Sequence, residues 1–514
     1  VARAGGALAG LAALVALLTR ASAHARDVQG STPELGFVQS LDDGAPSAEP
    51  IESEPSARPA ERAAPPGPGL AAGAEWARVA RARGRRADRR PNVILVTLES
   101  IALGHLGYQG YPRPTTPNLD RIAKESLRAR RAWTTATHSN YAQPAILSSL
   151  FPRRTTGFDV YRRLDYPRFL FHDLLASLGY ETATISSQDE NWQGMRRFED
   201  TGTPQYFWDS RSFTGSHLDS GSERVVPDAE TMTHALEWLT AHARGPFGLY
   251  LNLQMTHFPY KLPPGAPAPW QPVEVRRGFN YLGYSAADHE RAVNRYDAAL
   301  RYVDAQLGRL ERFLSARGLA ERTLLIITAD HGELFHEHGM VTHGKTLYEG
   351  EARVPLLVRF PGRVEPGELE APVSTLDIMP TIAELLGVPP HPSFQGTSLL
   401  ASSELAGERP AIFLNIQGLR SADAIVCWPW KLIVDRTGRR SQLFNLEADP
   451  AERHDRLAGE LALAAALRAT LEEQMRAQVR YHEPRGGARP KTFAPRLLGC
   501  PALPRESESV AGAR

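Results

Sequence analysis

The chain has 514 residues, a formal net charge of +1 and 42% hydrophobic residues, so it is globular in composition and long enough to bury a large core and a second lobe. The near balance of charge argues against nucleic acid as a partner. Only two cysteines occur, Cys427 and Cys500, which excludes a disulfide framework and a multi-cysteine zinc site and leaves one disulfide open.

Residues 1–25 have the pattern of a secretory signal peptide. Arg3 precedes an apolar run over 4–18, and Ala21-Ser22-Ala23 resembles a cleavage site. The run is short for a membrane span, which needs about 20 residues. We therefore expect a cleaved signal, with a membrane anchor as the alternative. Both readings place the bulk of the chain outside the cytoplasm, in a periplasmic or extracellular space, and leave membrane attachment through the N-terminus open.

Residues 26–90 are expected to form a disordered linker. The stretch 27–73 is rich in Pro, Ala, Glu, Ser and Gly and offers few large hydrophobic side chains to bury. Seven arginines follow between 78 and 90. They could contact a membrane surface or another polyanion, but a solvated linker end is the favoured interpretation.

Residues 91–405 alternate predicted strands with predicted helices. This alternation predicts an α/β domain with a mostly parallel sheet and helices on both faces. The expected strands are 92–98, 181–186, 247–253, 323–327 and 354–360, and the expected helices begin at 117, 169, 229 and 286.

The pattern changes after about residue 405. Short strands over 430–434 and 442–446 flank a turn, and 458–480 has apolar residues at helical spacing. These features predict a small C-terminal α+β subdomain over 406–483. The tail, 484–514, is rich in Pro, Gly, Arg and Ser and is expected to be loose, apart from a short apolar patch near Leu497.

Reactive side chains follow the predicted strands or begin a helix. In open α/β sheets ligands bind beyond the carboxyl ends of the strands, which makes these positions candidates for one site. They are Glu99-Ser100, the segment 137–140, His257, Asp330-His331 and the following His343-Gly344-Lys345.

A cation site and a nucleophile can be built from these residues. Glu99, Asp330 and His331 offer the carboxylate and imidazole ligands of a divalent metal site, although an Asp-His pair can also be a simple turn. A cation there could also bind the Ser139 oxygen and activate it, because a serine hydroxyl alone is a poor nucleophile. Ser139 could instead be only a helix cap, and Thr137 is the second candidate for the nucleophile.

Other polar residues are expected to bind the reacting group. His257, His343 and Lys345 could hold a tetrahedral anion, and one of them could protonate the leaving group. Asn140 and Gln143 could donate hydrogen bonds to the substrate or could pack locally.

The motifs, taken in order, resemble the sulfatase family of the alkaline phosphatase superfamily. The resemblance covers about 91–457 and implies an alkaline-phosphatase-like fold and an ester-cleaving enzyme. The matching segments are 91–95, 107–111, 115–120, 330–333, 343–345, 348–349, 353–356, 376–381, 443–446 and 449–450.

The chain departs from that family at the nucleophile. Sulfatases carry a Cys, or sometimes a Ser, in a C/S-x-P-x-R motif that is oxidised to formylglycine. Ser139 falls at that position, but the Pro and the Arg of the motif are missing and neither cysteine is near. We therefore expect no formylglycine. The chain is similar here to the branch with an unmodified Ser or Thr, which includes lipoteichoic acid synthase and phosphoethanolamine transferases.

The metal ligands depart as well. Many sulfatases have an Asp pair after the first strand and bind calcium, whereas Glu99-Ser100 stands at this place. A single divalent metal is expected at Glu99, Ser139, Asp330 and His331. A ligand set that contains imidazole favours Mn²⁺ or Zn²⁺, and Ca²⁺ or Mg²⁺ stays open.

The resemblance implies a metal-dependent hydrolase or transferase that cleaves a sulfate or phosphate ester. Phosphoryl chemistry is favoured, because a phosphorylated serine can be opened by attack at phosphorus, whereas a sulfated serine lacks the elimination route of formylglycine. The alternatives are a true arylsulfatase-like enzyme and a non-catalytic binder of anionic glycans or lipids. The expected partner is a sulfated or phosphorylated glycan, lipid or small molecule of the cell envelope.

Overall fold

The computed structural model describes residues 67–84, 90–152, 161, 164–220, 223–401, 411–418, 420–483 and 489–502. The predicted signal, 1–25, and residues 26–66 of the predicted linker lie outside this part. All described residues except Glu223 belong to one compact unit, Pro59–Ser220 with Arg224–Arg514. Among the described residues, no helix combines the length and the apolar character that a membrane span requires.

An eight-stranded sheet forms the centre of the larger, N-terminal part of the fold, in the order β13-β2-β12-β9-β1-β8-β4-β5. The strands from β9 to β5 are parallel, while β12 is antiparallel to both of its neighbours. The predicted α/β fold with a mostly parallel sheet is therefore confirmed. The strands are β1 (Asn92–Leu98), β2 (Leu127–Ala129), β4 (Glu181–Ser186), β5 (Tyr206–Trp208), β8 (Phe247–Leu253), β9 (Thr323–Ala329), β12 (Leu356–Arg359) and β13 (Gly367–Leu369).

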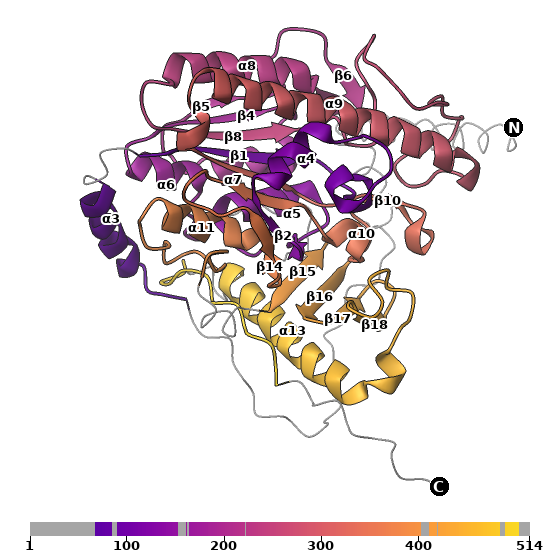
Figure 1. Cartoon of the computed structure of the whole chain (residues 1–514). Helices are drawn as coiled ribbons and strands as arrows, with labels where there is room; N and C mark the ends of the chain where they lie inside the picture. The colour runs from indigo at the N-terminus through magenta and orange to yellow at the C-terminus, as the bar shows by residue number, and fades with distance from the viewer. Residues whose placement is uncertain are drawn as a thin grey trace, which may run out of the picture. The chain divides into compact units, whose positions relative to one another are not determined.

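Helices cover both faces of this sheet (Figure 1). On one face α8 packs against β4 and β8, and α9 packs against α8 and α4; on the other, α6 packs against β4 and β8, and α5 contacts α7 and α11. The strands β1, β8 and β9 are buried along their whole length, as their unbroken apolar sequences require. The helices are α4 (Pro117–Lys124), α5 (Ser139–Ser148), α6 (Phe171–Ser177), α7 (Met195–Glu199), α8 (Asp228–His242), α9 (His289–Ala316) and α11 (Ile378–Leu385).

A four-stranded antiparallel sheet and a helix form the C-terminal lobe. The strands β15 (Ile412–Ile416), β16 (Ala422–Cys427), β17 (Trp430–Asp435) and β18 (Arg440–Asn445) pair in sequence order. The helix α13 (Leu461–His482) packs against β16 and β17. The small α+β lobe predicted from the sequence is thus present.

Part of the predicted linker is a helix, so the expectation of disorder is wrong for that part. The helix α3 (Ala71–Gly84) buries Trp76, whose ring lies 5.1 Å from Phe169 and 4.9 Å from His391. The Trp76 indole N–H also donates to the carbonyl of Pro389 over 2.7 Å. One large aromatic side chain with distant partners is enough to dock this otherwise polar helix.

Part of the predicted loose tail is also docked. Residues 489–502 lie against the C-terminal lobe, where Ala411 N–H donates to the Leu498 carbonyl and Leu498 N–H donates to Gln474, both over 2.8 Å. Cys500 forms a disulfide with Cys427, with 5.7 Å between the Cα atoms. The contacts at Leu498 fall in the apolar patch near Leu497 that the sequence set apart from the loose tail, and the cross-link at Cys500 extends the docked part beyond that patch.

Candidate active site

The residues that follow β1, β8 and β9 meet at one edge of the central sheet. Leu98 is aligned with Ala329 on β9 and with Leu253 on β8, so the three strands end together. The ladder continues one step, because Glu99 N–H donates to the Leu253 carbonyl over 3.0 Å and Asp330 N–H to the Leu98 carbonyl over 3.3 Å. Two side chains that are far apart in sequence therefore start from adjacent positions.

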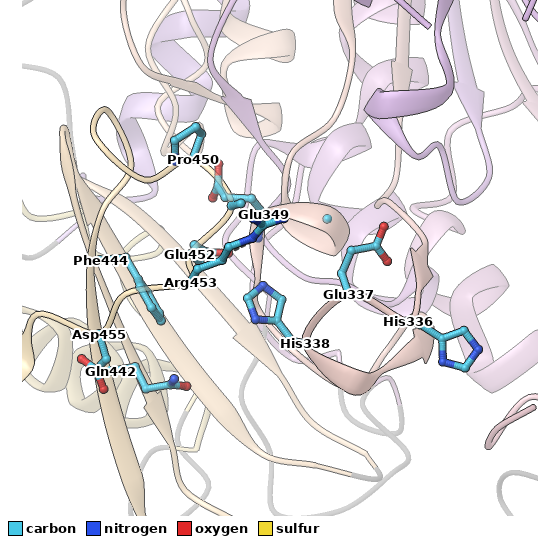
Figure 2. Close-up of a pocket in the computed structure, with 12 residues that line it drawn as sticks. His336, Glu337, His338, Glu349, Gln442, Phe444, Pro450, Glu452, Arg453 and Asp455 are labelled. Carbon is cyan, nitrogen blue, oxygen red and sulfur yellow. Dashed lines mark hydrogen bonds between the residues drawn. The ribbon is translucent and has the colours of Figure 1, made fainter. Parts of the chain in front are cut away.

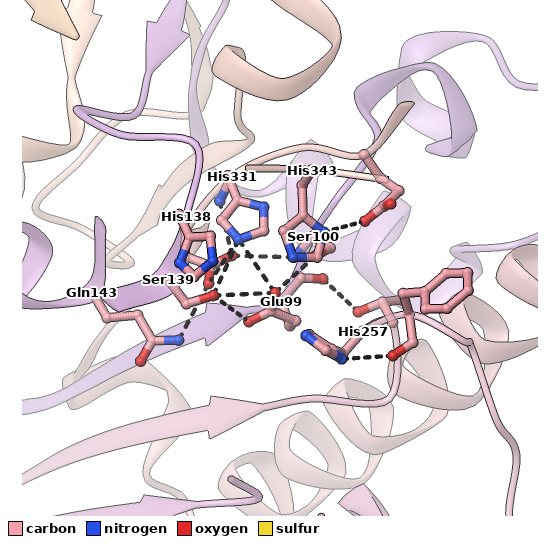
Figure 3. Close-up of polar contacts among 12 residues, drawn as sticks. Glu99, Ser100, His138, Ser139, Gln143, His257, His331 and His343 are labelled. Atoms are coloured by element: carbon pink, nitrogen blue, oxygen red, sulfur yellow. Dashed lines mark hydrogen bonds and ion pairs between the residues drawn. The ribbon is translucent and has the colours of Figure 1, made fainter. Parts of the chain in front are cut away.

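Glu99, Asp330 and His331 form a buried group that can hold a metal ion. Each offers one ligand atom, and these atoms lie within 4.8 Å of one another. His331 Nε2 lies 3.3 Å from Glu99 Oε1 and 3.6 Å from Asp330 Oδ2 (Figure 3). His331 Nδ1 donates to the Gly332 carbonyl over 3.0 Å, which leaves the Nε2 lone pair directed into the group. The structure thus brings together the three residues that the sequence predicted as ligands.

Ser139 lies against this group as the first residue of α5. Its Oγ lies 3.1 Å from His331 Nε2 and 3.2 and 3.3 Å from the two oxygens of Glu99. The preceding residue, His138, is extended at the N-cap position. A helix N-terminus favours an anion, so both an ionised Oγ and a bound oxyanion are stabilised here.

The two carboxylates of the group cannot both ionise freely in the absence of a cation. Burial and the charge of Glu99 raise the pKa of Asp330 to about 7. Burial also opposes ionisation of Glu99, but the positive charge that His331 and His257 carry when protonated, together with hydrogen bonds from its neighbours, lowers its pKa to about 2. A divalent cation would remove the repulsion between the charges of Glu99 and Asp330. Two buried carboxylates that repel each other without a cation are expected of a site that binds one.

Ser100 fixes the geometry of both carboxylates. Its N–H donates to Asp330 Oδ1 over 3.1 Å, and its hydroxyl donates to Glu99 Oε1 over 2.7 Å. Ser100 has a positive φ of 51°, which is unfavourable for a residue with a side chain. Such strain is held only where the surroundings fix it, and it is frequent at functional sites.

His257 and His343 also lie within reach of Glu99, and the His343 ring is 4.3 Å from that of His331. Burial lowers the pKa of His343 well below its usual range, so this imidazole is neutral. His343 Nδ1 lies 2.7 Å from Glu333 Oε2, and Glu333 also accepts a hydrogen bond from Tyr260 over 2.9 Å. His257 Nδ1 donates to the Phe258 carbonyl over 2.7 Å. The predicted anion-binding histidines are therefore at the same site, although their role stays a prediction.

Lys345 has a clear structural contact set. Its ammonium donates to the carbonyls of Val341 and Tyr281 over 2.9 and 2.5 Å and to Thr342 Oγ1 over 2.7 Å. These bonds tie together the segment that carries His343. Its predicted contact with an anion stays a prediction.

Gln143 is buried and bonded to the metal-binding group. Its Nε2 donates to Asp330 Oδ2 over 3.2 Å, and its Oε1 accepts from Asn252 and Gln188 over 3.3 and 3.4 Å. It therefore orients a carboxylate ligand. Its predicted hydrogen bond to a substrate stays a prediction.

Asn140 is held between two neighbours. Its Oδ1 lies 2.9 Å from His138 Nδ1, and its Nδ2 donates to Gln193. These contacts agree with the alternative in which the Asn140 amide packs locally. The substrate-binding role of Asn140 stays a prediction.

Sequence reasoning missed three residues around the site. Gln254 donates to Glu99 Oε2 over 3.1 Å, and it could have been found by the same rule as Glu99, because it follows a buried strand directly. Glu333 supports His343 and shares its motif with Asp330. His138 stacks on Trp192 with ring centres 5.3 Å apart, and burial lowers the pKa of His138 to about 4. That stacking has no signal in the sequence.

A cavity of about 580 Å³ lies away from this chemistry, between the turn at 336–338 and the C-terminal lobe (Figure 2). His338 stacks on Tyr348 there, with ring centres 3.8 Å apart. Neither Ser139 nor the metal-binding group lines this cavity, so its size does not make it the reaction site. Its lining includes His336, Glu337, His338, Gln442, Glu452 and Asp455.

Comparison with known proteins identifies the family. The family model described as sulfatase matches residues 91–388, which is more than half of the chain. The chain belongs to the sulfatase family. A second family model, described as the C-terminal part of N-sulphoglucosamine sulphohydrolase, matches residues 336–480 and so covers the C-terminal lobe of this sulfatase-family chain.

Relatives and solved structures agree with this assignment. Arylsulfatase K of Gallus gallus is 27% identical over 432 residues, which cover 71% of this chain and 79% of the relative. The fold is similar to that of a phosphonate monoester hydrolase of Agrobacterium radiobacter, with a TM-score of 0.59 and 20% identity. The match covers 76% of this chain and 96% of the hydrolase. It is also similar to a 2-O GAG sulfatase, with a TM-score of 0.61 and 19% identity. This match covers 80% of this chain and 99% of the sulfatase. The family assignment makes this chain an ester hydrolase.

Proposed function

We propose that this sulfatase-family chain hydrolyses phosphate or sulfate esters with Ser139 Oγ as the nucleophile. The observation that carries the proposal is the position of Ser139 Oγ, within 3.3 Å of both Glu99 and His331 at the start of a helix. A nucleophile next to acceptors for its proton and next to a metal-binding group is the arrangement that hydroxyl activation requires. A non-catalytic binder would not need it.

The donor set fits a divalent cation. Glu99, Asp330 and His331 would hold it together with Ser139 Oγ, and the imidazole favours Mn²⁺ or Zn²⁺. When bound, such an ion lowers the pKa of a coordinated hydroxyl and polarises an ester oxygen.

The residues then account for each bond that changes. Ser139 gives its proton to Glu99 or to a nearby base, and Oγ attacks phosphorus or sulfur while the bond to the leaving alcohol breaks. The leaving oxygen takes up a proton, which His257, at the partly exposed side of the site, supplies when its imidazole is protonated. Water then attacks phosphorus, or sulfur in the case of a sulfate ester, which breaks the bond to Oγ and releases phosphate or sulfate, and the proton held by the base returns to Ser139 Oγ. The sum is ester plus water to alcohol plus phosphate or sulfate.

Phosphoryl chemistry is favoured by the residues around Ser139. The sequence Ser139-Asn140-Tyr141-Ala142-Gln143 lacks the Pro and Arg that accompany formylglycine in sulfatases. Sulfate ester hydrolysis is the second candidate, and the arylsulfatase relatives support it. The similarity to a 2-O GAG sulfatase supports an anionic glycan as the substrate class.

Turnover of model esters tests the proposal. The full chain, loaded with Mn²⁺ or Zn²⁺, is assayed with 4-nitrophenyl phosphate, bis(4-nitrophenyl) phosphate and 4-nitrophenyl sulfate. Ser139→Ala should abolish hydrolysis, whereas Ser148→Ala should not, because Ser148 lies on the same helix and donates to the Pro144 carbonyl over 2.6 Å. Activity retained by Ser139→Ala would overturn the assignment of the nucleophile.

The mass of the peptide that contains Ser139 separates the two chemistries. An unmodified serine together with a preference for the aryl phosphate supports phosphoryl transfer. A peptide that has lost a pair of hydrogen atoms, together with a preference for the aryl sulfate, would show formylglycine and replace this proposal with the second candidate.

We also propose that the chain is exported. The signal-like pattern of residues 1–25 supports this, and so does the Cys427–Cys500 disulfide, because disulfides persist in oxidising compartments. Fractionation of cells that make the full chain should recover the protein outside the cytoplasm. Recovery only from the cytoplasm would contradict export.

A further inference from the structure

A second group of ligand atoms shares Glu99 with the first. Glu99, His257 and His343 each offer one atom, and these atoms lie within 4.8 Å of one another. We infer that a second divalent cation of an imidazole-preferring class, such as Zn²⁺, binds between these three residues. This goes beyond the proposed function, which needs only the group of Glu99, Asp330 and His331.

The hydrogen bond of His257 sets its ring for binding a cation. The Phe258 carbonyl can only accept a hydrogen bond, so Nδ1, at 2.7 Å from it, carries the proton. When the ring is neutral, its lone pair is on Nε2, and Figure 3 shows the ring beside Glu99. Histidine ligands of metals are usually oriented by such a bond from the other nitrogen.

His343 is set in the same way by two contacts. Its Nδ1 lies 2.7 Å from Glu333 Oε2 and 3.2 Å from Ser100 Oγ. Ser100 gives its one hydroxyl proton to Glu99 over 2.7 Å, so it can only accept from the imidazole. When Glu333 is ionised, Nδ1 of His343 faces two acceptors and donates, and its lone pair is then on Nε2. The carboxylate of Glu333 behind the ring completes the carboxylate–histidine pair found at zinc sites.

Glu99 can serve both groups because it has two oxygens. The His331 and His343 rings lie 4.3 Å apart by their centres, and the His257 and His343 rings lie 5.4 Å apart, so the three imidazoles are neighbours within reach of one carboxylate. Two imidazoles and a carboxylate are the ligands of several catalytic zinc sites, which keep a fourth position for water or substrate. The fully buried Glu99 would then bridge two cations.

This assignment changes the role expected for the two histidines. A neutral imidazole whose proton is on Nδ1 has no proton on Nε2 to donate to an anion. A cation bound by these two histidines would instead hold an oxygen of the ester. Two-metal sites stabilise the attacking and the leaving oxygens of a displacement in this way. The group recognised is therefore the phosphoryl or sulfuryl oxyanion of the substrate.

Metal stoichiometry of the full chain tests this inference. The protein is stripped with a chelator, dialysed against excess Zn²⁺ and then freed of unbound metal, and bound zinc is measured by mass spectrometry. Wild type and the control His454→Ala, whose imidazole is exposed, should hold about two equivalents. His257→Ala and His343→Ala should each lose about one equivalent, and Asp330→Asn should lose the other.

The pattern of losses separates the two sites. If wild type binds a single equivalent and His257→Ala and His343→Ala keep it, the second site is refuted while the first stands. If His343→Ala loses zinc and Asp330→Asn does not, the site of Glu99, Asp330 and His331 is refuted instead. Electron paramagnetic resonance of the Mn²⁺-loaded protein is an independent readout, because two ions that share Glu99 should be magnetically coupled in wild type and uncoupled in His343→Ala. Circular dichroism checks that each variant is folded.

Discussion

Gln143 donates a hydrogen bond from Nε2 to Asp330 Oδ2 over 3.2 Å, and so links the helix that begins with Ser139 to the end of β9, which Asp330 and His331 follow. The same amide accepts a hydrogen bond from Asn252 on β8. Gln143 stands where the sulfatase motif carries its arginine. A neutral amide at this place leaves the charge of Asp330 available to a cation.

Replacing Gln143 by leucine should weaken metal binding. The change keeps the approximate size of the side chain but removes the donor to Asp330, and outer partners of metal ligands typically contribute about 10–100-fold in affinity or activity. Titration of the metal-free protein with Zn²⁺ measures the effect. Gln306→Leu, a buried glutamine on α9 that bonds the Tyr302 carbonyl, is the matched control and should leave the affinity unchanged. Equal affinities for the two variants would refute this role.

The stability of the metal-free protein should depend on pH through Asp330. Its pKa is about 7 in the folded state, above its ordinary value of 3.8, so the folded state binds a proton that the unfolded chain has already lost. The contribution of Asp330 to stability therefore falls as pH rises through this window. Asp330→Asn has no carboxyl group to titrate, so it does not lose this stability as pH rises. Its melting temperature relative to wild type should rise between about pH 5 and about pH 8. A difference that does not change with pH would contradict the raised pKa.

Lys431 should be essential to the docking of the C-terminal lobe. It is fully buried on β17 and lies 2.8 Å from Glu349 and 2.9 Å from Glu452. Lys431→Met leaves the buried Glu452 without its counter-charge and leaves Glu349 with its longer ion pair to Arg353 at 3.5 Å, and breaking a buried ion pair typically costs about 3–5 kcal/mol. Denaturant unfolding measures the loss.

Two control variants test this ion-pair explanation. Arg476→Met removes an exposed ion pair with Glu473 and should cost at most about 1 kcal/mol. The triple variant Lys431→Met, Glu349→Gln, Glu452→Gln removes all three charges and should recover most of the stability. A Lys431→Met protein as stable as the Arg476→Met control would show that the buried pair does not matter.

The Cys427–Cys500 disulfide should stabilise the lobe and its docked tail. The two cysteines are 73 residues apart, and closing a loop of that length is worth at most about 4 kcal/mol in the chain-entropy account. Reductant should lower the melting temperature of wild type. It should not change the melting temperature of the double variant Cys427→Ala, Cys500→Ala. A wild-type melting curve that reductant leaves unchanged would contradict this role.

The strand ends made the centre of the site predictable from the sequence. Glu99 and Asp330 each follow a buried apolar strand, and the parallel register of Leu98 with Ala329 places them side by side. The family motif gave the position of Ser139. These features depend on local patterns, which one sequence contains.

The supporting contacts were not predictable in the same way. The bond from Gln143 to Asp330, the stacking of His138 on Trp192 and the docking of Trp76 each join segments that are distant in the chain. No periodicity or spacing specifies such pairs. The helix α3 was read as disordered because its sequence has few large apolar side chains, and only the position of its partners explains why one tryptophan suffices.

Anomalous scattering from a crystal loaded with Mn²⁺ or Zn²⁺ tests the central claim most directly. We predict a peak enclosed by Glu99, Asp330, His331 and the Oγ of Ser139, the four groups that the structure brings together. A map of the fully loaded protein with no peak among these side chains, or with Ser139 Oγ turned away from the ion, would contradict it.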